Sequence, residues 1–571
     1  MVQEYMNIDQ RFKSVIDEFE IDSPTIWNVP DGFISNGATV VIFGNCFYQC
    51  LTKRLIPPSV TKLDLKRSFN YCFGVQLDSL WEGLKELCMW STGTQETGKI
   101  EPSSLPLSLT LLDLSYYYHT LSNILPPNLK SLSIANLDKF QHGFTLPESI
   151  TQLKTKSIDL IENLSSISNL FSLQFDNQLP LDLFGADGMS NNITRLHFKS
   201  PNQNIEYFQY LSRNLVDLSI QFLHPLCLTE AMCLPSTLEI LKLHCINGQI
   251  CRNAIPSSVR DLELIFSGDQ TVLKEFYLPN SIERLQLYFG LIKQFPKDFN
   301  PITASVRELD INSISKDILK KSFPNSITKL TIGSFNSNTI RKGFVSSKFP
   351  SVLSHSSGLK FLSMFVCPKD KLVSTMFSTS LTYLKLENVH PVGFNMKLKP
   401  DTLISCQNLK TLCLGSLNLT PLFIPSSVTR LFLDLSNTTK LENVIPNSVC
   451  FLSLKWTSAS HQTIDLGIVP YSVETLVLNA SGGMIDSLDA LSDTIEYIDF
   501  GPNLTAYSFD SQRLTSLRHI KNLPWIQSTL TFPLYLESLH MTKNYYEKNF
   551  VQSFNNNSFP KNVPFINIVK K

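Results

Sequence analysis

One ten-residue phrase recurs along this chain, and it constrains the fold more than any other feature. It reads [I/L/F]-P-x-[S/N]-[L/V/I]-x-x-L-x-[L/I], as in IPPSVTKLDL from Ile56, IPSSVRDLEL from Ile255, LPNSIERLQL from Leu278 and IPSSVTRLFL from Ile424. Copies return about every 20–25 residues, which is the period of a solenoid whose turns are one strand wide. We therefore expect stacked turns of one kind rather than several separate globular folds.

Each part of the phrase has a physical reason. The L-x-L alternation is typical of a short, half-buried strand. Proline fixes φ and lacks an amide hydrogen, so it belongs at the corner before the strand. The Ser or Asn that follows can hydrogen-bond nearby backbone at the bend. One turn cannot bury its own leucines, but stacked turns can. The serines in question are Ser258, Ser281, Ser326, Ser427, Ser448 and Ser472.

The phrase resembles the FNIP repeat of amoebal and giant-virus proteins, a relative of leucine-rich repeats. Its Pro-x-Ser-Leu/Val-x-x-Leu-x-Leu core runs through residues 35–568. The resemblance implies a diverged member with a leucine-rich-repeat-like solenoid, about two dozen turns, one short parallel strand in each and few helices. The Phe-Asn pair that names the family survives only at Phe69-Asn70, Phe299-Asn300-Pro301-Ile302, Phe335-Asn336 and Phe394-Asn395.

Two segments lie outside the repeat. Residues 1–33 carry apolar side chains at roughly helical spacing, and a solenoid needs its first turn covered, so we expect a partly helical capping region. A helix that docks a partner is the alternative. Residues 34–568 form the solenoid, with longer loops near 334–355 and 387–405, and residues 569–571 form a disordered tail. The apolar residues of the first segment are Tyr5, Met6, Phe12, Val15, Ile16 and Phe19.

Charge and cysteine content indicate the environment of the protein. The 49 basic and 49 acidic residues cancel, which gives no reason to expect nucleic-acid binding. The charged N-terminus is unlike a signal peptide, and no apolar stretch approaches the roughly 18 residues of a membrane span. Cys227/Cys233 and Cys245/Cys251 come closest to a cysteine pattern, and we expect reduced, buried thiols. The sequence predicts a cytoplasmic protein without metal or cofactor.

Motifs for catalysis are missing from the sequence. It contains no G-x-S-x-G, G-x-x-x-x-G-K-[S/T], G-x-G-x-x-G or H-E-x-x-H motif, and its ten histidines are dispersed. The kinase motifs H-R-D and D-F-G are also missing. The carboxylates Asp261 and Glu263 stand side by side, but the repeat places them on a solvated strand face. We therefore predict that the protein is not an enzyme and has no catalytic residues.

The exposed strand face changes character along the chain. In each L-x-L strand, the residue before the first Leu and the residue between the two should face solvent. Through the middle of the chain the first of these positions alternates in charge, so neighbouring turns should neutralise one another. These residues are Arg195, Asp217, Ile240, Asp261, Arg284, Glu308 and Lys329.

Further along, the same positions become aromatic. A contiguous exposed aromatic strip is typical of a protein-recognition surface. The alternative is that a long loop, such as 387–405, folds over the strip and buries it. The predicted protein-binding residues are Phe361, Tyr383, Phe432, Phe451 and Tyr497.

A second candidate site is basic. Residues 52–69 hold five cations against one acidic residue, and their apolar residues Ile56, Val60, Leu65 and Phe69 follow the 1-5-10-14 spacing of calmodulin targets. The repeat generates this spacing by itself, however, and Pro57-Pro58 opposes a helix. The candidate contacts for calmodulin or another acidic partner are Lys53, Arg54, Lys62, Lys66 and Arg67.

These observations together predict a non-enzymatic scaffold or adaptor that binds proteins on the exposed sheet face of a solenoid. One alternative is a repeat protein regulated by calmodulin. Another is an adaptor that presents partners to a signalling or ubiquitin-ligase assembly.

Overall fold

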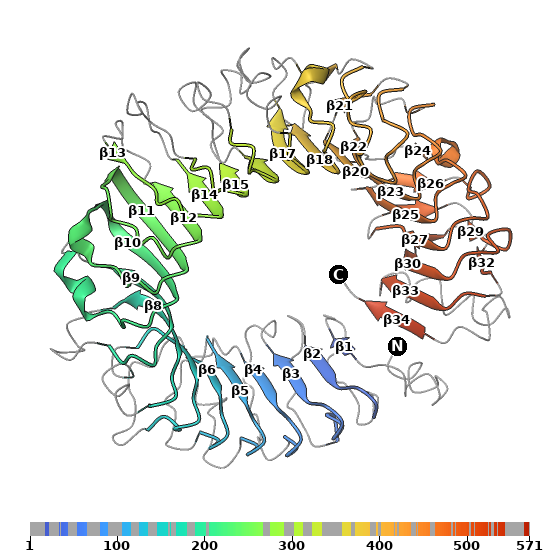
Figure 1. The fold of residues 1–571 in the computed structure, drawn as a ribbon. Coiled ribbons are helices and arrows are strands. Elements are labelled where there is room, and N and C mark those ends of the chain that lie inside the picture. The colour runs from blue at the N-terminus through green and yellow to red at the C-terminus, as the bar shows by residue number, and fades with distance from the viewer. Residues whose placement is uncertain are drawn as a thin grey trace. The chain divides into compact units, whose positions relative to one another are not determined.

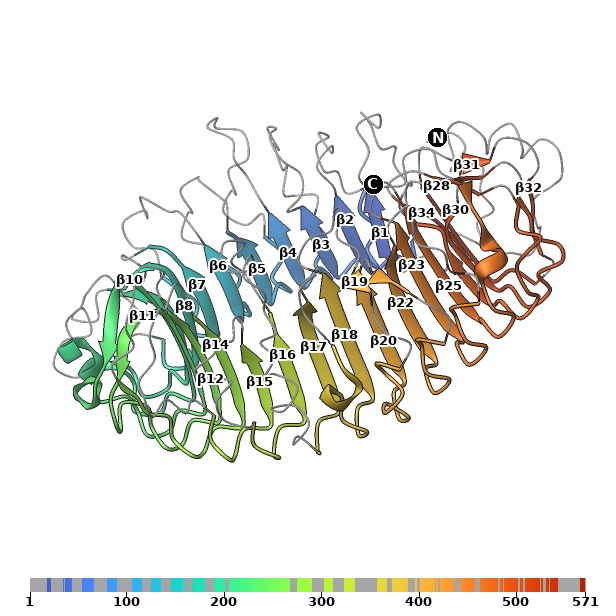
Figure 2. The same cartoon turned by 90° about the horizontal axis from the view of Figure 1, so that it is seen from above.

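The computed structural model of the chain contains two compact units, Met1–Ser267 (unit 1) and Gly268–Val569 (unit 2). Figures 1 and 2 show both as ladders of short strands joined by turns. The structure describes residues 18–21, 34, 36–43, 54–65, 80–89, 105–115, 125–134, 145–157, 160, 167–179, 189–200, 205–266, 275–289, 302–311, 323–333, 357–366, 372–388, 396–397, 401–415, 417–419, 422–435, 441, 443–456, 463–480, 483–485, 487–501, 504–506, 509–523, 525–526, 530–533, 535–542 and 565–569.

Unit 1 is a parallel ladder in which each strand pairs with the strand of the next turn. The pairing is in register, so that Leu112 of one turn faces Leu132 of the next and Leu153 of the one after. Two 3-10 helices, η4 (Ile205–Tyr210) and η5 (Glu230–Met232), lie in its connections. The strands are β1 (Glu18–Ile21), β2 (Val40–Phe43), β3 (Lys62–Leu65), β4 (Glu86–Met89), β5 (Leu111–Leu114), β6 (Ser131–Ile134), β7 (Gln152–Thr155), β8 (Ser172–Gln178), β9 (Arg195–Ser200), β10 (Asp217–Leu228), β11 (Ile240–Ile250) and β12 (Asp261–Phe266).

Unit 2 repeats the same arrangement. Leu362, Leu384, Leu412 and Leu431 occupy one register position on successive strands. Two 3-10 helices, η8 (Ser374–Met376) and η9 (Leu466–Ile468), lie in the connections. The ladder strands are β14 (Arg284–Tyr288), β15 (Glu308–Ile311), β16 (Lys329–Ile332), β17 (Phe361–Val366), β18 (Tyr383–Asn388), β20 (Thr411–Gly415), β22 (Arg430–Leu435), β23 (Phe451–Trp456), β25 (Thr475–Ala480), β27 (Tyr497–Asp499), β30 (His519–Leu523), β33 (Ser538–Thr542) and β34 (Phe565–Val569); β13 (Glu275–Phe276) precedes them.

The core confirms the predicted strand phase. Half-buried and buried residues alternate along the strands, as in β3 and β5. In β22 the same alternation begins with an exposed residue. Leu63, Leu112 and Leu431 are completely buried, whereas the residue that follows each of them in its strand is half-buried. Figure 1 shows the ladder strands of each unit along the concave side of an arc, with the connections outside. The fold is the predicted parallel-strand repeat solenoid.

The turn residues work as expected, with one difference. The proline carbonyl accepts a hydrogen bond from the amide three residues later, as from Val60 N to Pro57 O (3.1 Å). The serine hydroxyl, however, donates across turns: Ser59 Oγ donates to Ala38 O at 2.7 Å. Ser326, Ser427, Ser448 and Ser472 make the same bond to the preceding turn. These serines therefore tie turns together rather than satisfy their own bend, and Ser258 Oγ is buried without a partner.

Other expectations need adjustment. One strand per turn is too simple, because several turns of unit 2 carry a second short strand, forming the sheets β19–β21, β24–β26–β28–β31 and β29–β32. Phe19, part of the helical periodicity near the N-terminus, lies in strand β1, and the other residues predicted as the capping helix lie outside the described residues, as do most of 334–355 and 387–405. No helix in the described ranges is long and apolar enough to cross a membrane. The second strands are β19 (Met396–Lys397), β21 (Leu417–Asn418), β24 (Thr463–Ile464), β26 (Gly483–Ile485), β28 (Leu504–Ala506), β29 (Phe509–Asp510), β31 (Trp525–Ile526) and β32 (Leu530–Thr531).

Candidate functional site

The sheet face of unit 2 presents three parallel rows of outward side chains, because alternate residues of each strand face away from the core. The first row precedes the first buried leucine of each strand, and the second and third rows follow at intervals of two residues. From β17 to β23, the first row is Phe361, Tyr383, Thr411, Arg430 and Phe451; the second is Ser363, Lys385, Cys413, Phe432 and Ser453; the third is Phe365, Glu387, Gly415, Asp434 and Lys455.

The five predicted aromatics all lie on this face and are half-buried. They do not form one strip. Phe361 and Tyr383 stack with ring centroids 4.2 Å apart and planes 9° apart. Phe432 and Phe451 form a second, tilted pair at 5.1 Å. Tyr497 stands apart, with Thr475 between it and Phe451 in the first row.

A groove separates the two aromatic pairs, and strand β20 is its floor. Thr411, Cys413 and Gly415 are short side chains, whereas the flanking strands β18 and β22 raise Tyr383 and Phe432 on either side. The groove is shallow and open, with a volume of about 820 Å³. Its lining consists of Phe365, Tyr383, Lys385, Glu387, Thr411, Cys413, Leu414, Gly415, Arg430, Phe432, Leu433, Asp434, Ser453 and Lys455.

At the third-row end of the groove, basic and acidic side chains form ion pairs with one another. Lys385 Nζ lies 2.6 Å from Glu387 Oε1, and Lys455 Nζ lies 3.4 Å from Asp434 Oδ2. Burial raises the pKa of the Asp434 carboxyl despite the nearby lysine, and Asp434 Oδ1 is buried without a hydrogen-bond partner. This end of the groove therefore carries two close ion pairs and little net charge.

The floor of the groove holds a protonated thiol. The Cys413 thiol donates to Tyr383 Oη at 3.5 Å. Burial raises the pKa of Tyr383 and also that of Cys413, so both groups stay neutral. Because the thiolate is the reactive form of cysteine, a thiol with a raised pKa is a weak nucleophile.

The first-row end of the groove differs from the third-row end in that its cations lie against aromatic rings. The exposed Arg430 guanidinium lies over the Phe451 ring, with 4.8 Å from Cζ to the ring centroid. At the same row, Lys329 Nζ lies 5.6 Å from the Phe361 ring centroid and 3.3 Å from Glu308 Oε2. The Glu308–Lys329 contact is one of the cross-strand ion pairs expected from the alternating charges.

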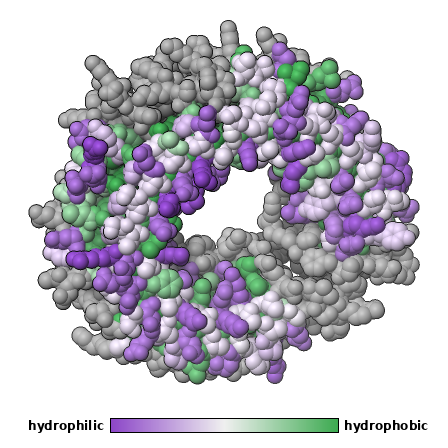
Figure 3. Space-filling model, viewed as in Figure 1, coloured by the Kyte–Doolittle hydropathy of each residue, from purple (hydrophilic) through white to green (hydrophobic). Residues whose placement is uncertain are grey.

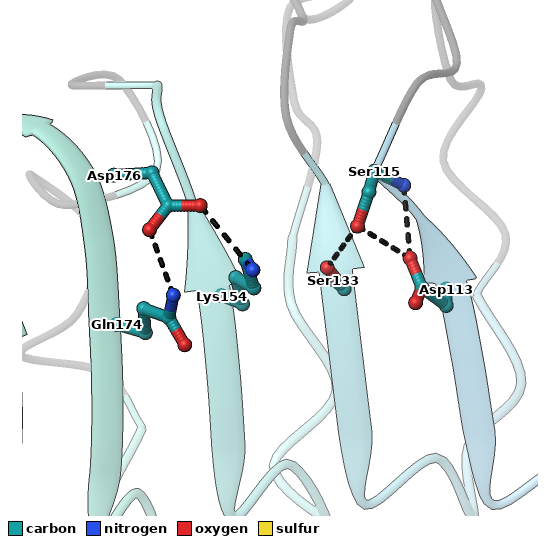
Figure 4. Close-up of polar contacts among 6 residues, drawn as sticks. All are labelled: Asp113, Ser115, Ser133, Lys154, Gln174 and Asp176. Atoms are coloured by element: carbon teal, nitrogen blue, oxygen red, sulfur yellow. Dashed lines mark hydrogen bonds and ion pairs between the residues drawn. The ribbon is translucent and has the colours of Figure 1, made fainter. Parts of the chain in front are cut away.

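On strands β5 to β8 of unit 1, polar side chains of the sheet face pair with one another. Figure 4 shows Ser115, which donates to Asp113 and exchanges a hydrogen bond with Ser133 of the next strand at 2.7 Å. One strand further on, Lys154 Nζ lies 3.3 Å from Asp176 Oδ2, which belongs to β8 together with Gln174. The Gln174 amide donates to the other oxygen of Asp176 at 2.7 Å. These polar groups form two sets, one across β5 and β6 and one across β7 and β8.

A second polar cluster in unit 1 surrounds Glu263 of β12. His244 Nε2 lies 3.3 Å from Glu263 Oε1, and Lys242 Nζ lies 3.6 Å from Oε2. The imidazole beside Glu263, with Lys242 adding to it, lowers the pKa of that carboxyl below its ordinary value.

In the space-filling view, hydrophilic side chains are common on the visible described surface and hydrophobic ones form scattered patches (Figure 3).

The basic segment 52–69 does not form an amphipathic helix where the structure describes it. Residues Lys62–Leu65 are strand β3, and Ile56, Val60 and Leu65 are core residues with no more than 2% exposure. Lys62 Nζ lies 3.3 Å from Glu86, and Arg54 is exposed. The apolar spacing thus comes from the repeat. Lys53, Lys66, Arg67 and Phe69 lie outside the described residues.

The expectation of buried thiols is wrong for the two cysteine pairs. Cys233 is exposed, and Cys227, Cys245 and Cys251 are half-buried. Cys233 follows η5 as its C-cap residue, with φ of 48°, and Cys245 lies at an irregularity in the pairing of β11, with φ of 66°. Within the described ranges, no three His, Cys, Asp or Glu side chains are grouped to hold a metal ion.

Sequence reasoning found the walls of the groove but missed its floor and its third row. The signal was present, since Thr411, Cys413 and Gly415 follow the same alternation as the aromatics. The floor consists of side chains that are shorter than their neighbours on the adjacent strands. It can therefore be recognised in the sequence only when neighbouring turns are aligned position by position.

Comparison with known proteins gives two similar solved structures. One is described as CroV588, a novel circular LRR protein; it has 21% identity and a TM-score of 0.46, covering 95% of this chain and 78% of that one. The other is a TLR13–ssRNA13 complex, with 15% identity and a TM-score of 0.47, covering 89% of this chain and 85% of that one. No family model and no curated protein match the sequence. The FNIP assignment therefore stays a resemblance.

Proposed function

We propose that this chain is a non-enzymatic scaffold that binds a protein partner on the sheet face of unit 2, with the groove over β20 as its anchor. The observation that carries the proposal is the pair of half-exposed aromatics, Tyr383 and Phe432, on either side of the short side chains of β20. Aromatic side chains beside a pocket are the preferred anchors of protein interfaces.

The ladder makes this surface rigid before any partner arrives. β18, β20 and β22 are joined in register over four or five residues each, and the leucines beneath the groove are buried. A preformed surface loses little conformational freedom on binding, which favours affinity. Because Tyr383 and Phe432 are outside the core, they are available for contact without disturbing the fold.

The finer alternatives receive less support from the described residues. Calmodulin binding would have to use a segment whose apolar residues Ile56, Val60 and Leu65 are buried. A signalling or ubiquitin-ligase adaptor needs a second partner surface, and the described outward residues on the strands of unit 1 include no aromatic pair of this kind. Both alternatives, and the cytoplasmic location, stay predictions.

The proposal is tested by selecting a random-peptide library on the immobilised full chain and rebinding the enriched pool to variants. We expect the pool to lose binding to the double variant Tyr383→Ala/Phe432→Ala. It should still bind Ser133→Ala/Gln174→Ala, which removes matched outward residues in unit 1. Circular dichroism and thermal melting should be unchanged in both. Equal recovery on wild type and the aromatic double variant would refute the groove as the anchor.

A further inference from the structure

We infer that the groove takes an extended peptide segment in which a carboxylate side chain stands next to an apolar one, and that Arg430 receives the carboxylate. This inference rests on the proposed function and adds the chemistry of the partner. It follows from the charge pairing of the face, the dimensions of the groove and the position of Arg430.

Arg430 differs from the other cations on the ladder strands around it. Among the described side chains on ladder strands β16 to β30, it is the one lysine or arginine that has no carboxylate partner and instead lies on the Phe451 ring. Stacking on an aromatic face holds a guanidinium plane in place and leaves its N–H edge open. That edge matches a carboxylate through two parallel hydrogen bonds. The paired cations are Lys329 with Glu308, Lys385 with Glu387, Lys455 with Asp434 and Lys521 with Asp499.

The charge distribution gives the groove a direction. Arg430 N donates to the carbonyl of Lys410 at 3.0 Å, so the two residues are neighbours at the first-row end. Lys410 is exposed, and so is Lys360, two strands away along the ladder. The opposite end holds the two ion pairs of Lys385 and Lys455. A bound carboxylate is therefore favoured at the first-row end, and an apolar side chain is favoured over Cys413 between the aromatic walls.

The dimensions favour an extended segment. Strands β18 and β22 are two ladder spacings apart, or about 10 Å between backbones, before the wall side chains are counted. An α-helix with its side chains is about 10–12 Å across and is too wide for this gap. Between Thr411 and Gly415 the floor extends about 13 Å, which suits a few extended residues.

Single-stranded nucleic acid is the competing partner, because it also uses aromatic and cationic groups. Binding of that kind neutralises several phosphates along a positive path. On the described ladder strands of this face the lysines are already paired with carboxylates. Arg430, with the exposed Lys410 just before β20, leaves too few cations in the groove for a path that follows several phosphates. The observations therefore favour a peptide with one well-placed acidic side chain.

The experiment is a charge swap. A random-peptide library is selected in parallel on the full-length wild type and on Arg430→Glu. We expect Asp or Glu beside an aromatic or aliphatic residue in the wild-type pool, and Lys or Arg at that position in the variant pool. A leading wild-type peptide is then compared with its Asn or Gln counterpart by fluorescence anisotropy. Arg430→Gln should weaken the acidic peptide about 10- to 100-fold and leave the amide peptide unchanged.

Arg195→Gln is the matched control, because Arg195 is an exposed first-row arginine of unit 1. It should leave both affinities unchanged. The inference is overturned if both pools share one consensus, or if acidic and amide peptides bind wild type alike. If binding still requires Tyr383 and Phe432 in that case, the proposed function survives; if it does not, both fail. Tight binding of labelled oligo(U) that is lost in Arg430→Gln would assign the groove to nucleic acid instead.

Discussion

The two units share one scaffold and differ in what they display on it. Both are parallel ladders with buried leucines at matching positions, such as Leu132 in unit 1 and Leu431 in unit 2. The residue after each of these leucines faces outward, and it is Ser133 in one unit and Phe432 in the other. The repeat therefore fixes where outward side chains are presented, and the residue types at these variable positions decide whether the surface offers a binding site.

Short side chains alone do not make a groove. Ser133 on β6 is as small as Cys413 on β20, but its hydroxyl contacts Ser115, and its neighbours in the same row are Asp113 and Lys154. Cys413 lies instead between Lys385 and Phe432 in its own row, and its thiol contacts Tyr383 of the first row. The difference lies in the walls, which are polar around Ser133 and include two aromatic rings around Cys413.

Core truncation should have the largest effect, and the same effect in both units. Leu132→Ala and Leu431→Ala each remove a fully buried side chain, and we expect each to lower the free energy of unfolding of the chain by about 2–5 kcal/mol. Ser133→Ala and Phe432→Ala, the outward neighbours, should change it by less than about 1 kcal/mol. Chemical denaturation of the four variants measures this. A large loss from Phe432→Ala would mean that the strand phase is not shared.

The next effect concerns a turn that both units use with different residues. Asp113 and Asp499 each accept a hydrogen bond from the amide two residues later, Ser115 at 3.0 Å and Gly501 at 2.9 Å. Gly501 has φ of 65°, and a Cβ there would lie 2.6 Å from Leu478 O, whereas Ser115 is not among the described residues with positive φ. Gly501→Ser should therefore destabilise by about 1–3 kcal/mol.

Ser115→Gly is the reciprocal change and should cost less than about 1 kcal/mol, mainly through lost hydrogen bonds and added chain entropy. Thermal unfolding of the pair gives the comparison. Equal melting temperatures for Gly501→Ser and wild type would show that the backbone there can relax.

Filling the groove should affect binding and spare stability. Cys413→Phe places a ring on the floor between the walls, so we expect peptides selected on the wild type to bind at least about tenfold more weakly, a loss of about 1.4 kcal/mol. Ser133→Phe adds the same ring to unit 1 and should leave binding unchanged. Anisotropy titrations with matched melting curves test both; unaltered affinity in Cys413→Phe would place the binding site elsewhere.

The smallest effect is a difference in pH response. The lowered pKa of Glu263 means that its contribution to stability is present above the ordinary carboxyl pKa and is lost as pH falls through the lowered value. The raised pKa of Asp434 has the opposite sign, because its folded state holds the proton more tightly and stability falls as pH rises through the carboxyl range.

We therefore expect Glu263→Gln to reduce the loss of stability on acidification, and Asp434→Asn to remove a loss of stability on raising the pH. Denaturation midpoints between about pH 3 and pH 6 measure both slopes. A change of slope relative to wild type that has the same sign in both variants would contradict the assignment.

Much of this fold could be predicted from the sequence, because the alternation within each repeat determines which residues of a strand face the core. The L-x-L phase correctly placed Leu431 inside and Phe432 outside, and it put the five aromatics on one face. It could not show that Phe361–Tyr383 and Phe432–Phe451 form separate pairs. That separation depends on which turns carry short side chains, and the third row, with Phe365 and Asp434, lies beyond the conserved spacing of the phrase.

The short side chains of strand β20, which form the floor of the groove, also have an evolutionary consequence. Each turn of a solenoid contacts only the turns beside it, so duplication of this one turn would widen the depression by about 4.8 Å, and its deletion would bring the two aromatic walls together. New ligand preferences could then arise by copying or losing genetic segments that encode whole turns, without altering a single contact residue.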